Sequence, residues 1–293
     1  MLSKMIAPTP TVRFMVAACL VVAAPMAGAQ PSVSDVGAPG GIAFAADGTE
    51  AEPFAAAQPP SGRGRPDFLF GRPRGFAGVS AGWLRATSGG VFDWFRGFLI
   101  SGVDDGGEFI PISRRAYDTA LFRIAAGYSV TSRVDLVFDV TPSDTVVRSE
   151  YEEWTNNGRP IAQSTQVWQI PLNAGVRYWV APRGRSIGRL AWVPSTVAFH
   201  VGGGLGLRWY RLEQFGEFVD YVDLTIWNDR LRSKGKALTR HVAAGVSLRL
   251  SRRIFAVAEA RRVWSQPVAN SSFDFGDIDL GGLHMTGGIE FVF

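Results

Sequence analysis

The side chains best suited to chemistry in this sequence are three histidines, His200, His241 and His284, which lie far apart along the chain. No two of them lie four residues apart around a glutamate, which is the spacing of a zinc site on one helix face. A serine, a histidine and a carboxylate cannot be grouped at one place without assuming a strand register. We therefore expect the histidines to join a polar network, and we expect no catalytic centre, metal or cofactor.

Charged side chains recur with a period of two in the same segments as the histidines, so they fall on one face of successive strands. Arginines and carboxylates are nearly balanced on this face, and forked hydrogen bonds can pair them if the face is enclosed. A wall of about eight strands leaves room for side chains alone, so we predict a charge-paired interior without a wide aqueous channel. The predicted network consists of Arg123, Asp135, Asp139, Arg177, Arg208, Arg249, Glu259, Arg261 and Glu290.

The elements that would position these residues are segments of alternating polarity, whose links differ in length. The links after the second and sixth segments are about three residues long, whereas those after the first, third, fifth and seventh run from about a dozen to nearly thirty. Short and long links of this kind are typical of barrels that cross a membrane. The link 182–195 departs from the pattern, since it is longer than a tight turn. The predicted strands are 75–86, 116–130, 134–148, 166–181, 196–212, 241–250, 254–264 and 281–293.

The two faces of these strands are the inverse of those in a soluble barrel. In 166–181 one face carries Trp168, Ile170 and Leu172, while the other carries Gln169 and Asn173. Lipid outside and a polar lumen inside would require this arrangement. The glycine run 202–204 lies inside a strand and suits the curvature of a narrow wall. The predicted fold is all-β, an eight-stranded antiparallel up-and-down transmembrane barrel.

The N-terminal part has a different composition. Residues 1–29 hold only Lys4 and Arg13 as charges, followed by a short apolar run and Ala27-Gly28-Ala29, which predicts a signal peptide cleaved after Ala29. Cys19 lies within it, so the mature chain would have no cysteine. Residues 30–66 are rich in Ala, Pro and Gly and predict a disordered periplasmic arm. The predicted barrel domain is 67–293, and its segment 67–74 could pack across the barrel mouth.

Charge gives no support to a nucleic-acid partner. Removing Lys4 and Arg13 from the 30 basic residues leaves 28 against 26 acidic ones, a net charge of +2. No basic block with interleaved aromatic residues occurs. No run of twenty apolar residues follows residue 30, so strands would have to cross any membrane.

The long links are the best place for a specific role, because binding residues usually lie on loops held by a rigid scaffold. The link 87–115 contains Trp94, Phe95 and Phe98, and the link 213–238 contains a run that suits either helical steps or an extended hairpin. We expect these apolar residues to pack on each other or cap the barrel, with a docking surface for a ligand as the alternative. The aspartates of 220–229 lack the spacing of a calcium loop.

The last residues carry a recognisable pattern. Thr286, Gly288, Phe291 and Phe293 match the closing strand of bacterial outer-membrane β-barrels, which this segment resembles. The stretches DFLFGRPRG, GRSIGRLAWVPS, GGGLGLRWYRLEQFGEFVDYVDL and TGGIEFVF are similar to exported bacterial proteins with the OmpA-type barrel domain. The resemblance implies the outer membrane, its lipid and the barrel-assembly machinery, but no catalytic residue. No peptidoglycan-binding domain is expected.

Together these observations predict a monomeric outer-membrane barrel that is not an enzyme. Its expected role is structural, adhesive or surface-binding, exerted through the long loops on an extracellular ligand that the sequence does not identify. A small gated conduit for a hydrophobic or small polar solute is the alternative. A membrane-embedded hydrolase is a further one.

Overall fold

The computed structural model describes residues 68–87, 89–220, 222–269 and 277–293. The chain divides into two units, Met1–Pro59 and Pro60–Phe293, and all described residues belong to the second. The predicted signal peptide 1–29 and arm 30–66 lie outside the described residues. Within the described part, no helix is long and apolar enough to span a bilayer.

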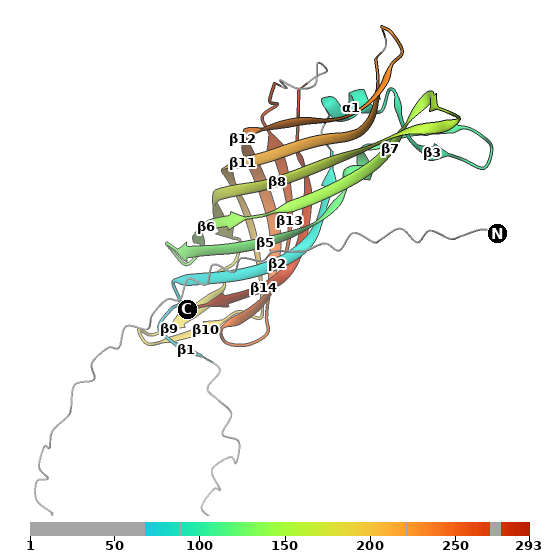
Figure 1. Ribbon diagram of the computed structural model, residues 1–293. Coiled ribbons are helices and arrows are strands. Elements are labelled where there is room, and N and C mark those ends of the chain that lie inside the picture. The colour runs from blue at the N-terminus through green and yellow to red at the C-terminus, as the bar shows by residue number, and fades with distance from the viewer. Residues whose placement is uncertain (1–67, 88, 221, 270–276) are drawn as a thin grey trace, which may run out of the picture. The chain divides into compact units, whose positions relative to one another are not determined.

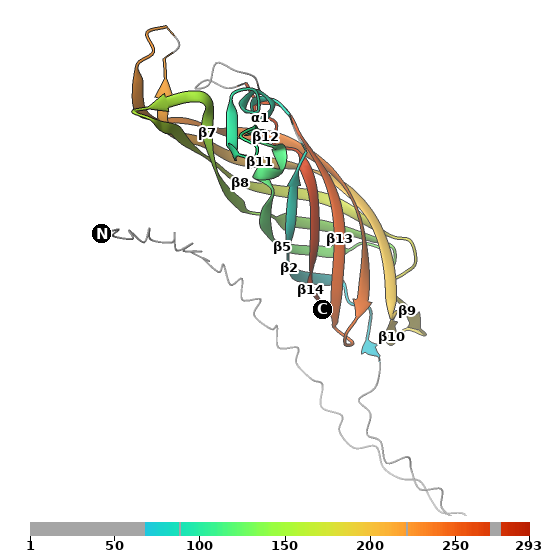
Figure 2. The same cartoon turned by 90° about the vertical axis from the view of Figure 1, so that its right-hand side faces the viewer.

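A closed ring of antiparallel strands forms the body of this second unit (Figures 1 and 2). Each strand pairs with the next one around the ring, and the ring closes where β14 pairs with β2 through contacts such as Gly288 with Ser80. The predicted all-β barrel of eight antiparallel strands is therefore confirmed. The ring strands are β2 (Gly75–Ala86), β5 (Thr119–Ser129), β6 (Val134–Val140), β8 (Arg159–Trp179), β11 (Val197–Val219), β12 (Ile226–Arg249), β13 (Ile254–Ser265) and β14 (Gly282–Val292).

The predicted third strand is interrupted. β6 ends at Val140, and β7 (Ser143–Asn156) begins after Thr141 and Pro142. A proline nitrogen cannot donate to a ladder, so the chain bends there. The carbonyl of Pro142 still accepts a hydrogen bond from the backbone N–H of Phe122 at 3.4 Å, which keeps the bend against β5.

Two of the predicted long loops are largely β-hairpins. β7 and β8 continue to a two-residue turn at Asn157 and Gly158, both with positive φ (51° and 76°), as a type I′ turn requires. β11 and β12 pair as far as Phe218 with Trp227 and Val219 with Ile226. The predicted ends of these strands were wrong because the exposed faces of the outer segments carry polar residues such as Asn228 and Lys234, while inward positions such as Ile161 are apolar. The alternation that marks the wall therefore does not continue into them.

The two ends of the barrel differ. We call the end with the links 130–133 and 250–253 the turn end, and it also holds Gly75 and Phe293. There the link between β8 and β11 forms β9 (Gly184–Ile187) and β10 (Ala191–Pro194), and β10 pairs with β1 (Leu69–Phe70). Residues Leu69 and Phe70 of the predicted segment 67–74 thus contact this link at the turn end, where Figure 1 shows β1 beside β10.

We call the opposite end the hairpin end, because the β7–β8 and β11–β12 hairpins lie there. The link between β2 and β5 contributes α1 (Val91–Phe95), β3 (Leu99–Val103), β4 (Phe109–Pro111) and the short 3₁₀ helix η1 (Arg114–Tyr117). Figure 2 shows α1 at the hairpin end, with the tip of the β11–β12 hairpin extending beyond it.

The wall has the face pattern that the sequence predicts. Outward-facing residues are large and apolar: Phe138 is 59% exposed and Leu205 is 70% exposed. Inward-facing residues of the wall, such as Asp139, Arg208 and Glu259, are buried. The apolar surface of the barrel is therefore outside and the polar surface is inside.

Candidate functional site

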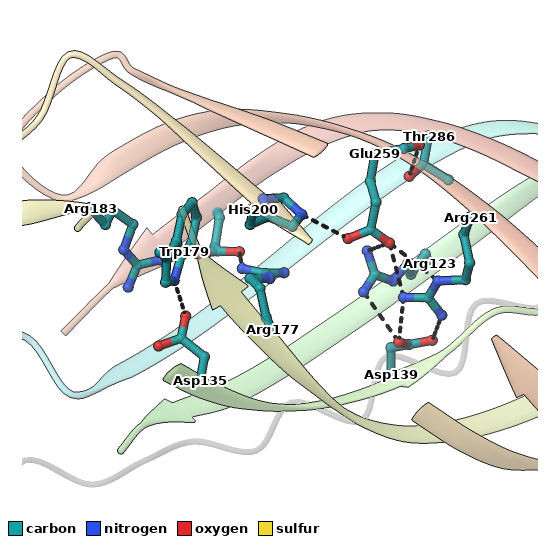
Figure 3. A network of polar contacts seen from close by, with 11 residues as sticks. Arg123, Asp135, Asp139, Arg177, Trp179, Arg183, His200, Glu259, Arg261 and Thr286 are labelled. Atoms are coloured by element: carbon teal, nitrogen blue, oxygen red, sulfur yellow. Dashed lines mark hydrogen bonds and ion pairs between the residues drawn. The ribbon is translucent and has the colours of Figure 1, made fainter. Parts of the chain in front are cut away.

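The barrel interior is filled by three groups of side chains at successive heights. The group at the turn end is called the aromatic plug, and the group in the middle is called the charge layer. The group at the hairpin end is called the apolar cap. Figure 3 shows the first two.

The charge layer consists of Arg123 on β5, Asp139 on β6, and Glu259 and Arg261 on β13. Arg261 binds Asp139 with two parallel hydrogen bonds, Nη1 to Oδ1 at 3.1 Å and Nη2 to Oδ2 at 3.0 Å, and its Nη2 also lies 3.0 Å from Glu259 Oε1. Arg123 joins the same two carboxylates at 3.2 Å each. Two cations thus face two anions, so the layer is electrically balanced.

Side chains outside the charge layer also contact its carboxylates. Asn173 Nδ2 donates to Asp139 Oδ1 at 2.8 Å, and Thr141 Oγ1 donates to the same oxygen at 3.2 Å. His200 Nε2 lies 3.3 Å from Glu259 Oε2. The charge layer thereby contacts β8 and β11 as well as β5, β6 and β13, and it cross-links opposite sides of the wall.

The aromatic plug surrounds a second ion cluster. Arg177 Nη1 donates to Glu290 Oε2 at 2.8 Å, and Arg183 binds the other oxygen of Glu290. The Arg177 guanidinium lies 4.9 Å from the centroid of the Phe76 ring, within cation–π distance. The cluster holds the closing strand β14 against β8 and the link that follows it.

Arg183 also contacts aromatic rings, at 5.2 Å from Trp179 and 5.6 Å from Phe255. Asp135 accepts a hydrogen bond from Trp179 Nε1 at 2.7 Å. Trp192 of β10 packs with Phe76 and Phe255. Arg183 was missed by sequence reasoning because it lies in a link, where the alternation that identified the other lumen residues does not apply.

The remaining predicted lumen residues lie outside these two clusters. Arg208 is fully buried and donates to the carbonyl of Leu280. Arg249 is only half-buried, at the turn end of β12. His241 and His284 are buried on β12 and β14. Within the described residues no group of His, Cys, Asp or Glu side chains is arranged to hold a metal ion.

The apolar cap closes the hairpin end. Val91, Phe92 and Phe95 of α1 are buried, and they belong to one cluster with Ile161 of β8 and Leu212 of β11. Tyr117 of η1 lies in this cluster, and burial raises the pKa of its phenol well above the ordinary value. The link 87–115 therefore covers the mouth of the barrel with apolar side chains, as expected of it.

Little space remains between these groups. The cavity beside the charge layer is about 20 Å³, and the one beneath the cap is also about 20 Å³. Each has room for roughly one water molecule. The described side chains therefore fill the interior.

The residues of the predicted assembly signal lie on the closing strand. The Phe293 carbonyl accepts hydrogen bonds from the backbone N–H groups of Arg74 and Gly75, both at 2.9 Å, and its own N–H donates to Gly75 at 2.9 Å. The side chains of Phe291 and Phe293 are exposed, and their rings stack at 6.3 Å. Thr286 Oγ1 donates to the Glu259 carbonyl at 3.4 Å, and Gly288 pairs with Ser80.

Comparisons with known proteins give a likeness of fold. No family model matches the sequence, and no curated protein matches it. Among solved structures, the outer-membrane protein OprG of Pseudomonas aeruginosa aligns with 8% identity and a TM-score of 0.41, over 77% of this chain and 99% of that one. Neisserial surface protein A aligns with 13% identity and a TM-score of 0.38, over 75% and 97%. The N-terminal β-barrel domain of Pseudomonas aeruginosa OprF aligns with 12% identity and a TM-score of 0.34, over 75% and 98%.

Proposed function

We propose that this chain is an integral outer-membrane protein of the OmpA-type small-barrel class, exported with a signal peptide cleaved after Ala29. In this proposal the closed barrel is an anchor, and the hairpin end, on the cell surface, carries a structural, adhesive or surface-binding role. The barrel-assembly machinery and outer-membrane lipid are its partners during and after insertion.

The observation that carries the proposal is the inverted wall. Large apolar side chains such as Phe138, Phe199 and Leu205 face outward, whereas ion pairs fill the inside. Such a wall is stable when hydrocarbon surrounds it. A closed ring of strands also leaves no strand edge with unpaired backbone groups exposed to the hydrocarbon.

Exposed apolar side chains at the hairpin end support the surface-binding part of the proposal. At the tip of the β11–β12 hairpin, Val222 is 93% exposed and Trp227 is 42% exposed, with Leu224 between them. The β3–β4 hairpin likewise exposes Val103 and Phe109. Apolar residues presented on a rigid scaffold favour contact with a partner surface.

The filled interior counts against the two alternatives. A conduit would have to displace the aromatic plug, the charge layer and the apolar cap together. A hydrolase built on His200 would need that side chain free, but it is buried against Glu259 within the charge layer.

Fractionation of a diderm host that expresses the full precursor tests the location. We expect the mature protein in the outer-membrane fraction, beginning at Gln30 and showing heat-modifiable gel mobility. Recovery in the soluble periplasm with no heat-modifiable form would refute the proposal. Planar bilayers containing the purified barrel should show no steady single-channel current.

Adhesion of the expressing cells to a hydrocarbon-coated surface tests the role of the tip. The variant V222S/L224S/W227S should reduce adhesion while keeping heat-modifiable mobility, because it removes apolar contact area. Leu250→Ser changes an apolar residue at the turn end that is about as exposed as Leu224, and this control should leave adhesion unchanged. Equal adhesion of both variants and the wild type would contradict a role for the tip.

A further inference from the structure

An open groove lined by four arginines lies on the outside of the wall, near the hairpin end. Arg85 comes from β2, Arg114 and Arg115 from η1, and Arg262 from β13. The groove has a volume of about 430 Å³, and Ala86 and Leu283 supply apolar surface to it. Three separate elements therefore bring guanidinium groups to one place.

Within the described residues, only one of the four arginines forms an ion pair, although the carboxylate of Asp118 accepts a hydrogen bond from the backbone N–H of Ala86 beside the groove. Arg114 pairs with Asp93 at 2.5 Å, and Arg262 donates to the hydroxyl of Thr87. Arg85 and Arg115 are exposed and make no ion pair within the described residues. The groove is thus suited to an anion that accepts several hydrogen bonds.

The groove continues into a row of basic and aromatic side chains on the outer wall. Arg85 pairs in register with Leu283, and Leu283 pairs with Arg262 on the next strand. Trp264 lies between Arg240 and Arg262, with guanidinium carbons 5.8 and 5.9 Å from its ring centroid. The outward-facing neighbours of the row on β2, β12 and β14 include no carboxylate: Trp83, Lys236, Leu238, Val242 and Met285.

The position of this row indicates its ligand. Tryptophan and arginine on the outer wall of a membrane barrel mark the boundary between hydrocarbon and head groups. The apolar band that includes Val242, Met285 and Ile289 begins immediately toward the turn end. A group bound in the groove would therefore lie at the depth of lipid phosphates, with Leu283 and Ala86 beside the first carbons of its chains.

We propose that the groove binds the phosphate of an anionic lipid in the leaflet at the hairpin end. Arg85, Arg115 and Arg262 bind the phosphate oxygens, and Arg114, held by Asp93, adds charge. The inference rests on the proposed membrane location, because an outer wall in water would not place a lipid there.

Lipid adducts of the purified mature protein, measured by native mass spectrometry in a neutral detergent, test the inference. The probes are dioleoyl phosphatidic acid, dioleoyl phosphatidylcholine with the same chains, and inorganic phosphate as competitor. We expect the wild type to bind phosphatidic acid with much higher affinity than phosphatidylcholine. The variant R85Q/R115Q/R262Q should lower the affinity for phosphatidic acid by at least about tenfold. The charge-matched control R74Q/R133Q/R253Q changes three exposed arginines at the turn end and should weaken it less than about twofold.

Two further variants test whether the geometry of the arginines matters and whether the effect depends on correct folding of the wall. The variant R85K/R115K/R262K keeps the charge but loses the forked geometry, so its loss of affinity should be intermediate. The single variant Arg115→Gln lies outside the wall strands, and it should weaken binding even if the triple variant fails to fold. Equal losses in groove and control variants would overturn the inference. Complete displacement of the lipid by inorganic phosphate, or preference for a glutamate peptide, would also overturn it.

Failure of this inference can be told apart from failure of the proposed function. A wild-type protein that is heat-modifiable and located in the outer membrane but binds both lipids equally refutes only the lipid site. A protein recovered as soluble periplasmic material refutes the location, whatever it binds in detergent.

Discussion

At the scale of single residues, the charge layer makes each partner depend on the others. Removing Arg261 would leave Asp139 and Glu259 with Arg123 as their one shared arginine in a buried setting. Removing Asp139 as well would leave the one-to-one pair of Arg123 with Glu259. A buried charge without its partner is costly, whereas a balanced deletion is far less so.

We therefore predict that Arg261→Gln lowers the free energy of unfolding by about 3–5 kcal/mol. The double variant R261Q/D139N should lose less than the sum of the two single variants, because charge balance is restored. Urea unfolding in lipid vesicles, followed by gel mobility, measures both quantities, and Arg133→Gln at the exposed turn end is the control. Additive losses would show that Arg261 and Asp139 act independently.

Alternation along the strands located most of the buried charges, but it could not show how they group. Arg177 and Glu290 pair with each other rather than with the charge layer, and Arg183 joins them from a link. That grouping depends on the register of β8, β13 and β14 relative to one another. The pattern of residues along one strand carries no information about this register. Arg249 shows a related limit, because the alternation continues to the end of β12, where the wall no longer encloses the side chain.

At the scale of elements, the link between β8 and β11 acts as a plug at the turn end. Its Arg183 and Trp192 enter the interior and pack with Phe76 and Phe255. We predict that R183A/W192A lowers the free energy of unfolding by about 3–5 kcal/mol, largely through the cavity left by the indole. No current should appear in planar bilayers, because the charge layer and the apolar cap remain. A steady current in this variant would show that the plug alone closes the barrel.

The same scale shows what the sequence reveals about the elements. The predicted bounds of β2 agree with the structure. Its residues alternate clearly between an exposed outer face and an enclosed inner face, so the pattern shows where the strand begins and ends. The outer parts of β7 and β8 were taken for a loop, although Asn157-Gly158 is a strong hairpin signal. The cap was foreseen from Phe95 and Phe98, but the insertion of α1 depends on partners in β8 and β11 that are distant in sequence.

At the scale of the whole molecule, the pairing of β14 with β2 closes the barrel, and the last residue extends this pairing. Phe293 makes three backbone hydrogen bonds to Arg74 and Gly75, and its ring occupies the space that a side chain at 75 would fill. We predict that deletion of Phe293 reduces the heat-modifiable fraction in the outer membrane severalfold, because closure and the predicted assembly signal are lost together. Phe293→Tyr keeps the aromatic ring and the backbone contacts and should insert normally. An unchanged yield after deletion would contradict the assembly role.

In the proposed membrane location, hydrocarbon surrounds this wall, so the depth of a residue should decide the cost of a charge on the outer face. Ile289 and Phe291 are both exposed on β14, but Phe291 lies one residue from the end of the strand and Ile289 lies deeper. Ile289→Arg should lower the free energy of unfolding in lipid vesicles by about 2–4 kcal/mol if its side chain lies near the midplane, and Phe291→Arg by about 1 kcal/mol or less, since arginine near the interface reaches water. In short-chain detergent the difference should be much smaller, because a micelle does not impose the depth profile of a bilayer. Equal costs of the two variants in vesicles would show that this face of β14 does not lie in a bilayer.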